Sequence, residues 1–362
     1  MKLVKQSYEI LEQEIPVHKL DDYSGFHFRE QYLENMYKHI ERCGRTCYKS
    51  EDKITPDSSK KFVDGLIKSK HLSVLEHGTI YLKYIFNPSK GEGKEFLKRY
   101  TFNPYSKMKT KVLEIEDFDK PIEEQVIGEK LKVTKVIAYV TTNFRVLVEN
   151  NWLDDLQYLC KPTEYHKLRH TALLHSCIHT YKDLTRHRKM SFSIESTRYC
   201  NYSKTDKFGE MKFVLPPWIK EKPTCNWEHP QKLHQPLRKE GEPLNDFGRV
   251  WYELCMEDVE RNWDTDEFKL ITKWNSADFY CHGLKCAEDS YNLLIELGWQ
   301  PQQAAEVLPQ CTAADVIMSG FDEDWKFVFD LRSDTALTGK PHPLVKEIMT
   351  PLRDEFKANN WI

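Results

Sequence analysis

Residues 186–199 are Arg-His-Arg-Lys-Met-Ser-Phe-Ser-Ile-Glu-Ser-Thr-Arg-Tyr. Arginine forks match phosphate oxygens bidentately, and a serine hydroxyl can donate to a phosphate oxygen. A solvated basic helix end would explain Arg186–Lys189, because cations favour helix C-termini. It would not explain the serines, the aromatic residues and the second arginine that follow. The run therefore predicts a site for a small, nucleotide-sized anion.

Length and composition narrow the class of protein. The chain has 362 residues, 40% of them hydrophobic, with a net charge of −3. This content supports a real core, and the balanced charge argues against bulk nucleic-acid binding. The sequence has no apolar run near the roughly 18 residues of a membrane span and no signal-peptide pattern, so we expect a cytoplasmic protein with no membrane partner. Ten cysteines without a CxxC pair indicate free thiols and no metal site.

Periodicity and punctuation predict the following elements. Helices are expected over 32–48, from Thr55-Pro56-Asp57 to about 70, over 133–150 and 166–186, from Ser276 to 297, and from Pro301, Asp322 and Pro343. Strands are expected over 80–85 and 109–115. These elements do not alternate regularly, so an α+β fold is favoured. Residues 220–247 are rich in proline, lysine and glutamate, which predicts an exposed excursion.

The spacing within the 186–199 run resembles the signature of flavin-dependent thymidylate synthases. Arg186-His187-Arg188, seven intervening residues and Ser196 match it, with Arg198 and Tyr199 also in register. His71-Leu72-Ser73-Val74-Leu75-Glu76-His77 resembles a second motif of the family, although His77 could equally be a core histidine. A third likeness joins Gly298–Pro309 to Leu331-Arg332. The resemblance spans segments of 43–85 and 170–350, and roughly half of the chain has no motif support.

The resemblance implies a single domain over 1–362, with a central mixed or antiparallel sheet wrapped by helices and an insertion at 87–165. It also implies a homotetramer with sites shared between subunits. Arg332 would be the catalytic residue, activating the pyrimidine. FAD would be held by His71, Ser73, Arg186, His187, Arg188 and Glu195. The nucleotide would be held by Asp183, Arg186, Ser196, Thr197, Arg198 and Arg332.

Several positions depart from the family pattern. Ala305 replaces the arginine expected to hold the nucleotide phosphate, and Ile194 stands where an acid is usual, with Glu195 displaced by one. Two further nucleotide contacts fall on Phe321 and Glu323. These departures affect the expected identity of the substrate more than the expected binding of the flavin. The histidine pairs 166/170 and 175/179 stand one helical turn apart if helical, but no HExxH motif accompanies them.

The reaction implied by the resemblance is reductive methylation of dUMP to dTMP. Methylenetetrahydrofolate would be the methyl donor, FAD the hydride carrier and NADPH the reductant. One alternative is C5 methylation or hydroxymethylation of another pyrimidine deoxynucleotide such as dCMP, since Glu306 or Asp183 could accept from a cytosine amino group. A flavin- or nucleotide-binding protein without turnover is the other alternative.

Overall fold

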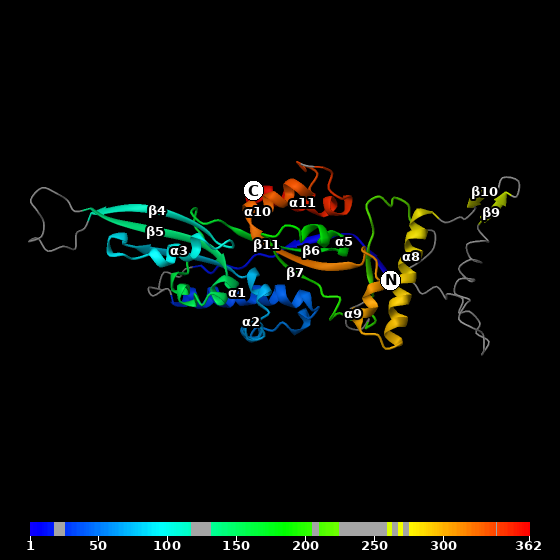
Figure 1. Cartoon of the computed structure of the whole chain (residues 1–362), viewed down its shortest axis with the longest axis horizontal. Coiled ribbons are helices and arrows are strands. Elements are labelled where there is room, and N and C mark those ends of the chain that lie inside the picture. The colour runs from blue at the N-terminus through cyan, green and yellow to red at the C-terminus, as the bar shows by residue number, and fades with distance from the viewer. Residues whose placement is uncertain are drawn as a thin grey trace, which may run out of the picture. The chain divides into compact units, whose positions relative to one another are not determined.

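The computed structural model describes residues 1–17, 26–116, 132–204, 210–223, 259–262, 267–270, 275–337 and 339–362 (Figure 1). These residues form two compact units. The first unit combines Met1–Lys5 with Asn201–Thr312, and the second combines Gln6–Cys200 with Ala313–Ile362. Every residue expected in the functional site lies in the second unit.

A four-stranded antiparallel sheet is the centre of the second unit. Its strand order is β2 (Ser7–Ile10), β6 (Arg169–Cys177), β11 (Ala313–Phe321) and β7 (Ser191–Ile194). On one face, side chains such as Leu174 and Val316 pack against α10 (Asp322–Arg332) and α11 (Pro343–Ala358). On the other face, Leu173 and Ile317 meet Cys43 of α1 (Phe26–Cys47). The sheet is therefore covered by helices on both faces, and the predicted α+β class is confirmed.

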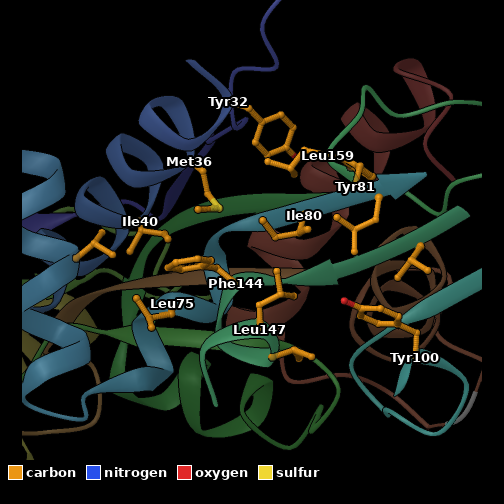
Figure 2. Close-up of a cluster of buried hydrophobic side chains, with 14 of the residues drawn as sticks. Tyr32, Met36, Ile40, Leu75, Ile80, Tyr81, Tyr100, Phe144, Leu147 and Leu159 are labelled. Carbon is orange, nitrogen blue, oxygen red and sulfur yellow. The ribbon is translucent and has the colours of Figure 1, made fainter. Parts of the chain in front are cut away.

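A second antiparallel sheet orders β3 (Thr79–Phe86), β5 (Lys132–Asn143) and β4 (Lys107–Glu116). One face of this sheet joins α1 in a large apolar core. Figure 2 shows Tyr32, Met36 and Ile40 of α1 gathered with Ile80 of β3 and Phe144, and all five are buried. The other elements that contribute to this core are α2 (Ser58–Lys68), α3 (Lys94–Thr101), α4 (Phe144–Glu149), η2 (Leu72–His77) and η5 (Leu153–Tyr158). Two further short helices, η1 (Glu51–Lys53) and η3 (Pro88–Lys90), bury no residue.

Two predicted helices are wrong over most of their length. Residues 133–143 lie in β5, and only Phe144–Glu149 is helical. Residues 169–177 lie in β6, followed by the short helix α5 (Ile178–Leu184). A central strand buried on both faces is apolar without alternation, and such a run imitates one side of a buried helix. The β-branched residues at the start of β5 were the missed signal.

The other predicted elements are confirmed, with small shifts at their ends. The helix expected from Ser276 is α8 (Ser276–Glu296), which has a capping box at Asn275 and is followed by Gly298 at φ +92°. The strand expected over 109–115 lies within β4. The assignment of 87–165 as an insertion stays a prediction, and most of the excursion expected over 220–247 lies outside the described residues.

The first unit has its own small core around Phe213, Cys281, Leu284 and Tyr291. In it, β1 (Lys2–Val4) pairs in parallel with β8 (Lys212–Val214), and β9 (Val259–Asn262) pairs antiparallel with β10 (Glu267–Leu270). Two short helices, α9 (Pro301–Ala304) and η7 (Ala305–Val307), complete this unit. Within the residues that the structure describes, no helix is long and apolar enough to cross a bilayer.

Candidate active site

The Arg186–Lys189 run forms the loop between α5 and β7. The amide of His187 donates to the carbonyl of Leu184 at 3.0 Å, and the amide of Met190 donates to the carbonyl of His187 at 3.0 Å. This compact turn buries His187 and Met190 and leaves Arg186, Arg188 and Lys189 exposed. Gly320 of β11 makes the close approach possible, because a Cβ there would stand 2.3 Å from the Met190 sulfur.

Arg332 is brought to this loop from the end of α10. Its Nε donates to Nε2 of His187 at 3.2 Å, and its Nη2 donates to the carbonyl of Asp183 at 3.1 Å. Its Nη1 lies 3.6 Å from the Asp183 carboxylate. Three residues expected in one site from separate motifs are therefore in direct contact. A guanidinium has five N–H groups, so Arg332 keeps donors for a ligand.

The environment of His187 favours the neutral imidazole. Burial, together with the charge of Arg332, lowers the pKa of His187 to about 4, although Asp183 opposes the shift. Because Nε2 accepts from Arg332, we place the remaining proton on Nδ1. His187 therefore orients the arginine without adding a second positive charge beside it.

Among the residues that the structure describes, neither Arg186 nor Arg188 forms an ion pair within the protein. Both are exposed, so a buried structural role does not explain them. Two unpaired guanidinium groups beside the Arg332 contact make this loop suited to an anion.

Strand β7 points its side chains alternately to the two sides of the sheet. Ser191 and Ser193 are buried on one side, whereas Phe192 and Ile194 pack into the cluster under α10 and α11. Glu195 continues the serine side and is buried. The displacement of the acid from 194 to 195 therefore moves the carboxylate to the opposite face, into the interior.

An ion cluster that the sequence did not predict surrounds Glu195. Lys49, after the end of α1, lies 3.1 Å from Oε2 of Glu195 and 2.5 Å from Oδ2 of Asp315. Asp315 also accepts from Nδ1 of His175 at 2.7 Å, and its amide donates to Glu195 at 3.1 Å. Burial opposes the ionisation of Asp315, but the His175 hydrogen bond and the Lys49 charge lower its pKa to about 2. No local sequence signal links positions 49, 195 and 315.

The expected nucleotide residues follow β7 in a turn. The amide of Ser196 donates to the carbonyl of Cys47 at 2.9 Å, and the amide of Cys200 donates to the carbonyl of Ser196 at 3.0 Å. Thr197 is half-buried and Arg198 is exposed. The guanidinium of Arg198 lies 5.3 Å from the centre of the Tyr199 ring. The structure thus brings Ser196–Arg198 to the surface from a well-anchored strand end.

The second expected flavin segment lies in η2, packed against β7. His71 and Ser73 are exposed. His77 is fully buried, with Nε2 2.8 Å from the Ser193 hydroxyl and Nδ1 2.7 Å from the Ser319 hydroxyl. The interpretation of His77 as a core histidine is therefore confirmed, and this histidine ties η2 to the sheet that carries the arginine loop.

Other candidate features lie elsewhere. Two surface depressions, of about 820 and 610 Å³, lie over α1 and α2 and contain none of the expected site residues. Among the described residues, no three His, Cys, Asp or Glu side chains are arranged so that they could hold a metal ion. The one-turn spacing considered for His166 and His170 does not exist, because His170 lies in a strand and His166 precedes it. Ala305 begins η7 in the first unit.

Residues 171–350 match the family model described as thymidylate synthase complementing protein. This segment, just under half of the chain, is similar to that family. The match contains Arg332 and His187, which are in contact, and also Ser196–Arg198. It excludes His71, Ser73 and Lys49.

Solved structures give weaker likenesses. The UMP/dUMP methylase PolB from Streptomyces cacaoi, bound with 5-Br dUMP, is 18% identical over 52% of this chain and 66% of that chain, with a TM-score of 0.31. Thymidylate Synthase X (ThyX) from Helicobacter pylori, with FAD and dUMP, is 14% identical over 51% of this chain and 66% of that chain, with a TM-score of 0.29. The chain thus spans just under two thirds of either relative. No curated protein sequence matches the chain.

Proposed function

We propose that this protein catalyses reductive methylation of a pyrimidine deoxynucleotide at C5, converting dUMP to dTMP. The observation that carries the proposal is the contact of Arg332 with His187 and Asp183, inside the segment that matches the family. Chain-distant residues expected to share one site are assembled there, and the arginine retains donors for a ligand.

The exposed side chains around the arginine loop fit an anionic flavin cofactor. Arg186 and Arg188 are unpaired within the described protein, and His71 and Ser73 present further donors at the start of η2. In our proposal these four residues hold FAD, with His187 shaping the loop beneath it. When bound, FAD supplies the hydride that completes the methyl group. NADPH and methylenetetrahydrofolate are the proposed co-substrates.

The nucleotide is proposed to lie between the turn and Arg332. The hydroxyls of Ser196 and Thr197 and the guanidinium of Arg198 would hold its phosphate, with Arg186 shared between phosphate and flavin. Arg332, oriented by neutral His187 and by Asp183, would stabilise negative charge that develops on the pyrimidine. Glu195 would support the site from the protein interior without touching a ligand, because its carboxylate binds Lys49. A homotetramer with shared sites and a cytoplasmic location complete the proposal.

The decisive experiment follows methyl transfer by purified, FAD-loaded protein. We expect an absorption band of oxidised flavin, and formation of dTMP from dUMP that requires methylenetetrahydrofolate and NADPH. Parallel reactions with dCMP and UMP identify the base. Turnover of dCMP alone would overturn dUMP as the substrate. A protein that binds FAD and dUMP but forms no product would overturn the catalytic proposal, and a colourless protein that takes up no FAD would overturn the flavin site.

A further inference from the structure

Three consecutive residues after α1 contact the segment proposed to hold the nucleotide. The carbonyl of Cys47 accepts from the Ser196 amide, the Tyr48 ring lies 5.3 Å from the Tyr199 ring, and Lys49 binds Glu195. We call Cys47, Tyr48 and Lys49 the α1 clamp. Its contacts cover both ends of the Glu195–Tyr199 segment.

The backbone of the α1 clamp turns sharply at Lys49, where α1 ends. Lys49 has φ +46°, in the left-handed region that costs a residue with a Cβ and suits glycine. Such a conformation persists when surrounding contacts determine it. Here the determining contacts are the backbone hydrogen bonds that end α1, from the Lys49 amide to the Thr46 carbonyl at 3.3 Å and from the Ser50 amide to the Arg45 carbonyl at 3.1 Å. The turn points the Lys49 ammonium at Glu195 and Asp315, which it bridges.

Ion pairs and backbone hydrogen bonds hold Lys49, Glu195 and Asp315 together. Burial opposes the charge on Lys49, but Glu195 and Asp315 outweigh this effect and raise its pKa. Glu195 and Asp315 are further joined through their backbones, since the Glu195 amide donates to the Asp315 carbonyl at 2.8 Å. Lys49 thereby connects α1, the end of β7 and the start of β11 at the residue that precedes Ser196.

We infer that the α1 clamp positions Ser196–Arg198 for the nucleotide, with Lys49 as the positioning residue. The inference rests on the proposed function for the identity of the ligand, but the clamp itself is a property of the free protein. Lys49 touches neither ligand in this assignment. It holds Glu195 inward, so that the next three residues face outward in one arrangement.

The test compares Lys49→Met and Lys49→Gly with the control Lys53→Met. Glycine accepts φ +46° without strain, so Lys49→Gly removes the ammonium while favouring the backbone turn. Lys53 is an exposed lysine of η1 in the same surface region. We expect hydrogen exchange of the Ser196 amide in ligand-free protein to rise about tenfold in both Lys49 variants, and to stay unchanged in Lys53→Met.

Nucleotide binding supplies the functional measurement. In FAD-loaded protein, the Kd for dUMP should rise about tenfold in both Lys49 variants, a loss of about 1.4 kcal/mol of binding free energy, because Ser196–Arg198 are no longer held in one arrangement. FAD affinity should stay within about twofold, because its proposed residues lie outside the clamp. In Glu195→Gln, the further change caused by Lys49→Met should be smaller than in the native background, since the two side chains share one interaction.

Three outcomes separate the alternatives. Unchanged exchange at Ser196 would overturn the α1 clamp. Faster exchange with an unchanged Kd for dUMP would overturn its positioning role. A native protein that binds neither FAD nor any pyrimidine nucleotide would contradict the proposed function and the positioning role that depends on it, whereas the exchange measurement would still decide whether the clamp exists.

Discussion

The buried chain of hydroxyl and imidazole groups at His77 gives a sharp stability prediction. A neutral imidazole has one donor and one acceptor, and the Ser193 and Ser319 hydroxyls satisfy both at 2.8 and 2.7 Å. Ser193→Ala leaves one buried ring nitrogen without its partner, which costs about 1–3 kcal/mol. Ser319→Ala also removes the partner of the Thr171 hydroxyl, 2.6 Å away, so its cost should be the larger.

Equilibrium unfolding in urea, followed by circular dichroism, measures these changes. The urea concentration at the midpoint of unfolding should fall in both variants. The m-value, which is the slope of the unfolding free energy against urea, should stay constant because the surface exposed on unfolding is unchanged. Ser69→Ala is the matched control, because Ser69 is a largely exposed serine after α2, and it should change the free energy of unfolding by less than about 0.5 kcal/mol. If Ser193→Ala and Ser319→Ala both fall within that control range, the reasoning about His77 is refuted.

Three other predictions concern pH, catalysis and a buried carboxylate. Burial, with the charge of Arg169, lowers the pKa of His39 to about 4, and that of His187 is also about 4. Since the unfolded chain binds more protons between pH 6.5 and 4, the free energy of unfolding should fall on acidification through that window, by on the order of 3 kcal/mol per histidine; urea midpoints that are equal at pH 7 and 4.5 would contradict this. Arg332→Lys keeps the charge but loses the fork that binds His187, so kcat should fall about 100-fold or more with FAD affinity unchanged, and native turnover in this variant would exclude the catalytic assignment. Asp155→Ala leaves the Tyr100 hydroxyl, 2.8 Å from the carboxylate, and the Arg99 guanidinium unpaired, and should destabilise the protein by about 3 kcal/mol in thermal or urea unfolding; a loss below 1 kcal/mol would show that water replaces the carboxylate.

Local signals predicted most helices correctly. Proline or a capping side chain marks the starts of α8, α9 and α11, and Gly298 marks the end of α8, because such residues act through their own backbone geometry. The prediction failed at β5 and β6. Their identity depends on burial from both sides by elements distant in sequence, which periodicity within one segment does not report.

The candidate site shows the same division. The motif spacing singled out Arg186–Arg188, Ser196 and Arg332, and in the structure Arg332 donates to His187. It did not indicate that Glu195 would turn inward. That outcome follows from the position of Glu195, which continues the serine side of β7, and from Lys49, which follows α1 and stands 146 residues earlier in the chain (195 − 49).

The sequence by itself determined the groups available for chemistry, because arginine, histidine and serine carry their hydrogen-bonding capacity wherever they stand. It also determined the segments whose caps and turns are local. Only the tertiary structure decided the protonation states of these groups. Burial beside Arg332 keeps His187 neutral, and Lys49 stabilises the ionised Asp315. Solvation and charge proximity depend on which distant segments pack together, and the chain sets these only when the sheet has formed.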